Sequence, residues 1–225
     1  KKAQQIKLDV QDIKELAKQN SQALNHPISL GIIPTVSPYF LPLILPTIQK
    51  EFPNLTLRIE ELQSQFLVKK LKEGELDMAI LALPYDLKGL ISLKFWEEDF
   101  YLVSHKENKN AGATEIKANQ LDQSKLMLLD DGHCLKDHIL DACNIANASK
   151  HSLKASSLLT LIQLVKGQMG STLVPQMALK ELVASRKELS ISHLNEPGPH
   201  REIALIVREN YAGIENAMFL LEFFK

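Results

Sequence analysis

Two periodicities of hydrophobic and polar positions alternate along the chain and predict the order of its elements. From residue 28 onwards, short apolar runs typical of buried strands are followed by segments whose apolar residues recur every three or four positions, as in an amphipathic helix. Strands that alternate with helices in this way are typical of an α/β fold with a largely parallel sheet. We therefore expect an α/β architecture over most of the chain.

The apolar runs place the expected elements at definite positions. Strands are expected at 28–34, 55–62, 75–83, 126–129, 171–175, 189–194 and 201–209, with two more between 92 and 104 around an acidic turn. Helices are expected at 64–74, 158–167, 176–185 and 213–224, and after residue 134. A further helix should start at Ser37, which with Pro38 behind it is typical of an N-cap, and the interior Pro42 and Pro46 should kink that helix.

The first twenty residues carry a narrow apolar seam formed by Ile6, Val10, Ile13 and Ala17, at spacings of four, three and four. Such a seam on a helix favours pairing with a second helix. An amphipathic helix that lies on its own domain fits the same pattern, so both interpretations remain open at this point.

Composition and charge exclude several classes of protein. The sequence has 26 lysines and arginines against 27 acidic residues, so its net charge is close to zero. It therefore lacks the basic surface that a domain needs to bind nucleic acid by itself. Its apolar runs fall short of the roughly 20 residues that a membrane helix needs, and no secretory leader begins it. Two cysteines are too few for a secreted disulfide scaffold. We expect a cytoplasmic location.

Polar side chains follow three of the expected strands, where helices begin: Thr35 with Ser37, Ser64, and His133 with Cys134. Ligands bind at the carboxyl ends of strands in open α/β sheets, and the free N–H groups of helix starts favour anions and polar oxygens. A shared cleft is one interpretation of this pattern. The alternative is that the hydroxyls are helix caps and nothing more.

The stretch "GHCLKDHILDAC" holds both cysteines of the chain. Cys134 is expected at a helix N-terminus, where the dipole and free N–H groups stabilise a thiolate, and His133 and Lys136 would add positive charge. An exposed thiolate of this kind attacks peroxides or disulfides. Cys143 shares a helical face with apolar residues, which favours a buried thiol. An unreactive loop cysteine at 134 remains the alternative.

Helix geometry opposes a direct bond between the two thiols. Nine residue steps of about 1.5 Å separate the α-carbons of Cys134 and Cys143 by roughly 13 Å, whereas a disulfide needs them within about 7 Å. A disulfide between them would have to unwind the helix and would act as a switch. A zinc site formed by the two cysteines with His133 and His138 has less support than redox chemistry, because the paired spacing of zinc ligands is missing. A cysteine hydrolase is also possible, but no sequence signature supports it.

The same stretch resembles the hydrogen-peroxide-sensing OxyR group of the LysR-type transcriptional regulators. The segments "GIIPTVSPYFLP", "FPNLTLRIEELQS", "GELDMAILAL", "GSTLVP" and "REIAL" resemble LysR-type regulatory domains in order. The resemblance implies two α/β subdomains of periplasmic-binding-protein type with mixed sheets. Subdomain I would hold residues 23–96 and 203–225, subdomain II residues 97–202, and residues 1–22 would end a dimerising linker helix.

The resemblance also implies a role for individual residues. Cys134 would be the peroxidatic cysteine and Cys143 the resolving one. The residues around the peroxide would be Thr35, Ser64, Gly132, His133, Asp137 and Arg201, with Arg201 stabilising the thiolate. Ser64 stands where the group often has threonine, which keeps the hydroxyl and drops a methyl.

The function implied is that of a sensor and not of an enzyme with turnover. Hydrogen peroxide would oxidise Cys134 to a sulfenic acid, the disulfide with Cys143 would follow, and a cellular thiol reductant would reset it without any cofactor. The resemblance implies a homodimer of this domain, a tetramer of the whole regulator, and promoter DNA bound by an N-terminal winged helix-turn-helix outside this chain. The alternatives are a domain that binds a small metabolite, with incidental cysteines, and a thiol peroxidase.

Overall fold

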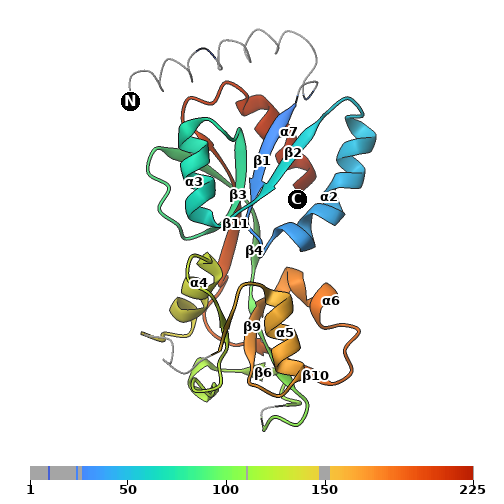
Figure 1. Ribbon diagram of the computed structural model, residues 1–225, viewed down its shortest axis with the longest axis vertical. Coiled ribbons are helices and arrows are strands. Elements are labelled where there is room, and N and C mark those ends of the chain that lie inside the picture. The colour runs from blue at the N-terminus through green and yellow to red at the C-terminus, as the bar shows by residue number, and fades with distance from the viewer. Residues whose placement is uncertain (1–9, 11–23, 25–26, 110, 147–152, 225) are drawn as a thin grey trace. The chain divides into compact units, whose positions relative to one another are not determined.

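The computed structural model describes residues 10, 24, 27–109, 111–146 and 153–224, and the chain divides into two compact units (Figure 1). The first unit holds the residues up to Trp96 together with those from Ile203, and the second holds Glu97–Glu202. The expected linker helix at 1–22 lies outside the described residues, apart from the exposed Val10.

The first unit is built on a five-stranded sheet of order β2-β1-β3-β11-β4. Its strands are β1 (Ile28–Ile32), β2 (Leu57–Glu61), β3 (Met78–Leu83), β4 (Leu90–Glu98) and β11 (Arg201–Arg208). Strand β1 pairs in parallel with β2 on one side and with β3 on the other. Every residue of β3 is buried, which explains its uninterrupted apolar run "MAILAL".

Three helices cover this sheet: α2 (Ser37–Glu51), α3 (Ser64–Glu73) and α7 (Ile214–Phe224). Figure 1 shows α3 on one side of the sheet and α2 with α7 on the other. Helix α3 packs against β3, and α2 contacts α7. Phe40 of α2 meets Phe224 of α7 edge to face, with ring centroids 5.2 Å apart. The apolar stripes of both helices are thereby buried.

Helix α2 corrects the expected N-cap, and its two interior prolines do not end it. Ser37 is its first residue and not its N-cap, which is Val36, and no side chain caps the helix. The helix also continues without a break past Pro42 and Pro46 to Glu51. Proline removes one N–H at each position, yet the burial of Phe40, Ile44 and Ile48 along one face holds the segment helical.

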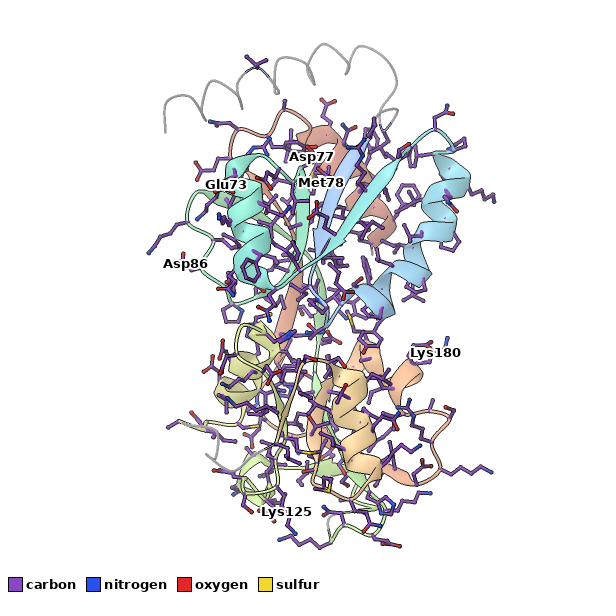
Figure 2. All side chains as sticks on the ribbon, in the orientation of Figure 1. Glu73, Asp77, Met78, Asp86, Lys125 and Lys180 are labelled. Carbon is purple, nitrogen blue, oxygen red and sulfur yellow. The ribbon has the colours of Figure 1, made fainter. Side chains whose placement is uncertain are left out.

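The strand ends of the first unit are fixed by side-chain hydrogen bonds. Asp77, labelled beside Met78 in Figure 2, immediately precedes β3. Its Oδ2 accepts hydrogen bonds from the N–H and the hydroxyl of Ser29, at 2.7 and 2.5 Å. Helix α3 ends as the sequence predicts, because Gly74 adopts the left-handed conformation at its C-cap with φ 72°.

The second unit is built on a four-stranded sheet of order β6-β10-β5-β9 with a separate pair, β7 and β8. Strand β10 runs parallel to β6 and antiparallel to β5, so the sheet is mixed. Its strands are β5 (Phe100–His105), β6 (Glu115–Ile116), β7 (Leu128–Leu129), β8 (Lys154–Ala155), β9 (Thr172–Pro175) and β10 (Leu189–Leu194).

The helices of the second unit are η1 (Ala118–Gln120), α4 (Cys134–Ala142), α5 (Leu158–Lys166), η2 (Gln176–Ala178) and α6 (Leu179–Leu182). Helix α5 packs on β5 and β9, and α4 contacts β7. The expected helix at 176–185 is a 3-10 turn followed by one short helical turn. Within the described residues, no helix combines the length and the apolarity needed to cross a membrane.

Candidate functional site

Helix α4 carries one cysteine at each end. Cys134 is its first residue, behind the extended N-cap His133, as the sequence predicts. Cys143 is its C-cap and donates its N–H to the Ile139 carbonyl at 3.0 Å. Neither cysteine is in a disulfide, and both are buried, with 6% of Cys134 and 5% of Cys143 exposed. The expectation of an exposed Cys134 is therefore wrong, because the helix buries Cys134 together with Leu135, His138 and Ile139.

The continuous helix keeps the two thiols apart. Residues 134–142 are helical without interruption, so nine steps at about 1.5 Å place the α-carbons of Cys134 and Cys143 roughly 13 Å from each other. A disulfide needs this distance to fall below about 7 Å. The two cysteines can therefore bond only after the helix has come apart between them.

The environment of Cys143 holds it as a thiol. Burial raises the pKa of the Cys143 thiol to about 12, and the negative charge of Glu196 adds to this effect. Since the thiolate is the nucleophile, Cys143 is inert as long as it stays in this position. Its expected place in the core is confirmed by its burial.

His133 supplies no positive charge near neutral pH. Burial lowers the pKa of its imidazole below the ordinary value, and the nearby Asp130 carboxylate opposes this only in part. The imidazole is therefore neutral at pH 7, with one ring nitrogen as a donor and the other as an acceptor.

This lowered pKa predicts that acid destabilises the second unit. The unfolded chain binds the proton of His133 more readily than the folded chain does, so the free energy of unfolding should fall as the pH drops below about 6.5. His133→Asn should flatten that dependence. Urea unfolding at pH 7 and at pH 5.5 measures both, and an equal loss of stability in the wild type and in the variant contradicts this account.

Gly132 shapes the turn into α4. It is exposed and has φ 93°, in the region where a side chain is strained. Gly132→Ala should destabilise the fold by about 1–2 kcal/mol. Gly167→Ala is the control, because Gly167 has an ordinary φ of −74° and an added Cβ would meet its neighbours at 3.4 Å or more. Thermal unfolding of both variants measures the difference, and equal effects would rule out the strain at residue 132.

Asp131 neutralises the lysine that the sequence places near Cys134. Its carboxylate pairs with Lys136 and, at 3.2 Å, with Lys154 of β8. The hydrogen bonds from Lys136 and then Lys154 hold the pKa of Asp131 below its usual range. Lys136 is thus engaged with Asp131, and its charge is compensated. Asp137, another member of the expected site, lies in the first turn of α4 and is exposed.

Arg201 forms a buried ion pair that the sequence did not predict. Its Nε donates to Glu98 Oε1 at 2.7 Å, and its Nη2 lies 2.7 Å from the same oxygen. The other oxygen, Oε2, accepts from the Met177 N–H at 2.8 Å. Both side chains of the pair are fully buried. The charge of Arg201 is therefore compensated by a carboxylate, and Glu98 fixes the position of its guanidinium group.

Thr35 and Ser64 belong to the first unit, whereas the other six expected site residues belong to the second. Thr35 follows β1 and Ser64 follows β2, and since these strands are parallel neighbours, both residues lie at the same edge of the sheet. Thr35 is 3% and Ser64 1% exposed. Ser64 starts α3 without capping it, and its buried hydroxyl has no hydrogen-bond partner within the described structure. Interpreting Ser64 as a helix cap is therefore wrong.

The arrangement around α4 suits thiol chemistry. A buried thiol lies at a helix start, where the free N–H groups favour a thiolate, and the residue before it carries a neutral imidazole that can donate a hydrogen bond or accept a proton. Among the described residues, no cluster of three or more histidine, cysteine, aspartate or glutamate side chains could hold a metal ion.

Sequence reasoning missed two acidic residues of this unit, Glu98 and Glu196. Glu98 lies in the run "EED", which is typical of an exposed turn. The local sequence does not indicate that Glu98 is buried while its neighbours are not. Glu196 follows β10 in a polar loop. Both lie far along the chain from the residues that they affect, so no periodicity could reveal them.

Comparison with known proteins places these features in a family context. A model of the LysR substrate binding domain matches residues 21–225. The HTH-type transcriptional regulator EstR of Acinetobacter baylyi is 38% identical over 93% of this chain and 69% of its own length. A probable hydrogen peroxide-inducible genes activator of Mycobacterium avium is 39% identical over 86% of this chain. The chain spans 63% of the length of that relative.

Among solved structures, a hydrogen-peroxide-bound cysteine mutant of Corynebacterium glutamicum OxyR is similar over 98% of this chain and 70% of its own. The TM-score is 0.86 and the sequence identity 32%.

Proposed function

Because the chain belongs to the LysR substrate-binding-domain family, we propose that it is the regulatory domain of a transcriptional regulator that senses hydrogen peroxide. The observation that carries this proposal is the placement of two buried cysteines, neither of them in a disulfide, at the two ends of one helix. The relatives named as peroxide-inducible activators and the likeness to peroxide-bound OxyR support it.

The first step is the oxidation of Cys134. Its thiolate attacks one oxygen of hydrogen peroxide, the O–O bond breaks, and the hydroxide that leaves takes a proton to become water, so that a sulfenic acid remains. The helix start stabilises the thiolate. The neutral His133 donates a hydrogen bond to the leaving oxygen, and the proton that the Cys134 thiol gave up completes the water. Thr35 and Ser64 orient the peroxide, and the unpartnered hydroxyl of Ser64 supports that role.

Three further residues complete the proposed site. Arg201 stabilises the thiolate, and its buried pair with Glu98 keeps the guanidinium in one position. Gly132 leaves the turn open to a close approach of the peroxide, since it is exposed and carries no side chain. Asp137 is the acidic neighbour in the first turn of α4.

The second step joins the cysteines. The sulfur of Cys143 displaces hydroxide from the sulfenic acid, the S–S bond forms, and the hydroxide takes up the proton of the Cys143 thiol as water. Since α4 separates the two thiols, this step requires the residues between them to leave the helix. Leu135 and Ile139, 0% and 2% exposed in the described state, then change their surroundings.

The switch would act through assembly and DNA. We place the rearrangement of residues 134–143 at the start of a change in a homodimer of this domain, within a tetramer of the whole regulator. Promoter DNA would be bound by a winged helix-turn-helix domain outside this chain. A cellular thiol reductant would reset the disulfide, so the chemistry is single-turnover and cytoplasmic. Regulatory subdomain I would comprise 23–96 and 203–225, subdomain II 97–202, and residues 1–22 would end the linker helix.

A second candidate is a domain that binds a small metabolite and whose cysteines are incidental. The similarity to EstR and the unpartnered Ser64 hydroxyl favour it. A metabolite domain should show a ligand-induced rise in melting temperature that survives Cys134→Ser. Screening a library of small metabolites against both proteins distinguishes the two functions, since a peroxide sensor shows no such shift.

Counting thiols tests the proposal. One equivalent of hydrogen peroxide per chain should remove both titratable thiols rapidly, and a thiol reductant should restore them. Steady consumption of excess peroxide in the presence of reductant indicates a thiol peroxidase instead. Oxidation of Cys134 no faster than that of a free cysteine in solution overturns the sensor function.

A further inference from the structure

Helix α4 holds a buried histidine that the proposed chemistry does not use. His138 is 3% exposed and lies in the middle of the helix whose first residue is Cys134. The ordinary pKa of histidine lies closer to neutral pH than that of other side chains, so an imidazole exchanges protons readily there. A buried imidazole on the helix of a reactive thiol is therefore a candidate for the group that handles the proton of that thiol.

The spacing along α4 makes His138 a neighbour of Cys134. Residues 134–142 are helical without interruption, and side chains four positions apart on a helix have Cβ atoms about 5–6 Å from each other. The Cα–Cβ bonds of a helix tilt toward its N-terminus, so the imidazole extends toward the turn that begins with Cys134. Cys134 is 6% exposed, so both side chains lie on the buried face of the helix.

The other basic groups of the proposed site are less suited to take the thiol proton. Lys136 and Arg201 are each paired with a carboxylate, and a charged ammonium or guanidinium group has no lone pair that accepts a proton. The neutral imidazole of His133 belongs to the residue directly before Cys134, and side chains of consecutive residues on a helix do not face each other. His138 alone among these four lies one helical turn from the thiol on the same face.

We propose that His138 is the base that takes the proton of Cys134 and holds it until the peroxide bond breaks. The inference rests on the proposed function and deepens it by naming the group that carries this proton. The imidazole nitrogen accepts the proton of the thiol, so that a thiolate and an imidazolium form as neighbours. Their opposite charges stabilise each other, as in other pairs of a nucleophile with an adjacent base.

The proton returns in the same turnover. The thiolate attacks one oxygen of hydrogen peroxide, the S–O bond forms, and the O–O bond breaks. The hydroxide that leaves takes the proton from the imidazolium and becomes water. The sulfur is thereby oxidised to the sulfenic acid, the peroxide is reduced, and the imidazole of His138 is neutral again.

This pairing explains how a buried thiol can be reactive. Burial penalises a lone thiolate, because it is a charge taken out of water. Proton transfer from Cys134 to His138 leaves the total charge of the site unchanged, so the thiolate forms together with its own counter-charge. The N–H groups at the helix start then add to the stability of the pair.

His138→Gln tests the proposal, because the amide is polar but cannot take up a proton. A Cys143→Ser background leaves Cys134 as the one thiol of the chain, and its alkylation by iodoacetamide needs no peroxide. At pH 7 the His138→Gln protein should react about tenfold more slowly than its parent, since it loses the thiolate that the imidazole creates. At about pH 10 a thiol is ionised without a base, so the two rates should agree.

Measurement at two pH values separates proton transfer from packing. Loosened packing changes the access of the reagent, so it alters the rate by the same factor at both pH values. Equal rates at pH 7, or the same factor at both pH values, therefore overturn the proposal. The two proteins share the other charged and titratable groups of this region, which are Asp130, Asp131, His133, Lys136, Asp137 and Lys154.

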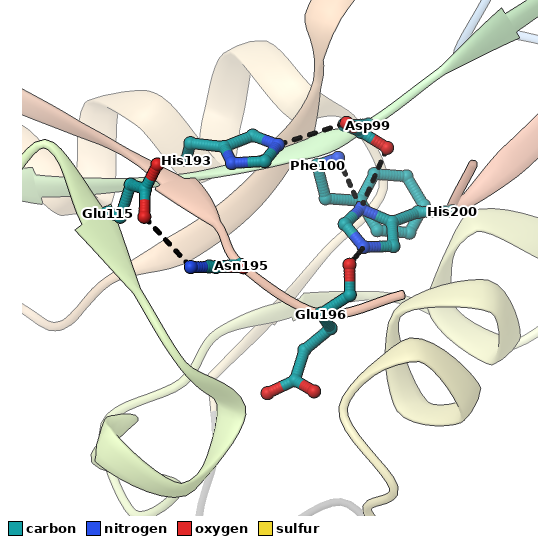
Figure 3. A network of polar contacts seen from close by, with 7 residues as sticks. All are labelled: Asp99, Phe100, Glu115, His193, Asn195, Glu196 and His200. Atoms are coloured by element: carbon teal, nitrogen blue, oxygen red, sulfur yellow. Dashed lines mark hydrogen bonds and ion pairs between the residues drawn. The ribbon is translucent and has the colours of Figure 1, made fainter. Parts of the chain in front are cut away.

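His193→Gln is the matched control. This histidine of the same unit lies on β10, and its Nε2 is 3.0 Å from Asp99 Oδ2 (Figure 3). The variant removes an imidazole that is not on α4, so alkylation of Cys134 should keep its rate at both pH values. A slowing at pH 7 as large as that in His138→Gln overturns the proposal, because it indicates a general response to the loss of a histidine.

The protein with His138 intact gives a test that does not depend on the folding of the variant. In the Cys143→Ser background, alkylation should reach half of its maximal rate well below about pH 8.5, where an ordinary thiol titrates. A midpoint at or above that value overturns the proposal.

Peroxide distinguishes this inference from the proposed function. If the alkylation results are as expected but the wild type does not react with peroxide, the sensor function fails and the thiol–imidazole pair remains. If His138→Gln forms the disulfide as fast as the wild type, the sensor function remains and His138 is not the base.

Discussion

Cys134→Ser is expected to abolish the fast reaction with hydrogen peroxide and to leave Cys143 reduced. The serine hydroxyl cannot form a sulfenic acid, and Cys143, whose pKa burial and Glu196 raise to about 12, has almost no thiolate at neutral pH. The loss should therefore be complete and not partial. Stopped-flow measurement of peroxide consumption at pH 7, with thiol titration afterwards, gives both quantities.

Cys143→Ser is the companion variant. It should react with peroxide at the wild-type rate but stop at the sulfenic acid, which a dimedone adduct at Cys134 would reveal. The two variants together assign one step to each cysteine. If Cys143→Ser removes the fast reaction and Cys134→Ser keeps it, the roles are reversed and the placement of Cys134 at the helix start has no chemical meaning.

Glu98→Gln is expected to destabilise the protein by about 3–5 kcal/mol, because it removes the carboxylate charge that pairs with the fully buried guanidinium group of Arg201. The pair joins the end of β4 to the start of β11, and the Met177 N–H shares the same carboxylate. A fall in the urea concentration at half-unfolding measures the effect. Replacing both partners by apolar residues, Glu98→Leu with Arg201→Met, should recover a large part of it.

Glu73→Gln provides the control for this loss. Glu73 pairs with Lys69 on α3 at 4.0 Å, and the lysine side chain is 69% exposed, so its removal should have little effect on stability. The account of a buried, essential pair fails if Glu98→Gln is no more destabilising than Glu73→Gln.

Local patterns predicted most of the fold. The uninterrupted run at β3 indicated a buried strand, Gly74 marked the end of α3, and the start of α4 was expected at or near Cys134. These features depend on residues close in sequence, for which backbone preferences decide the structure. The two prolines of α2 lie inside one continuous helix, which is buried along one face.

The electrostatics of the site could not be predicted, because they depend on residues distant in sequence. Glu98 and Arg201 are 103 positions apart. Burial removes the charge expected from His133, and Asp131 compensates the charge of Lys136. The burial of Cys134 follows from packing that a helical pattern alone does not fix. The sequence thus predicts which residues could act, and the structure decides which of them carry a charge.

One measurement tests the central claim most directly: peptide mass spectrometry of the protein before and after one equivalent of hydrogen peroxide. The account predicts two reduced thiols before treatment, since neither cysteine is in a disulfide in the described state, and a disulfide that joins the peptides of Cys134 and Cys143 afterwards. Oxidised Cys134 with Cys143 still free and no cross-linked peptide, even at long times, contradicts a switch that works by dismantling the helix between them.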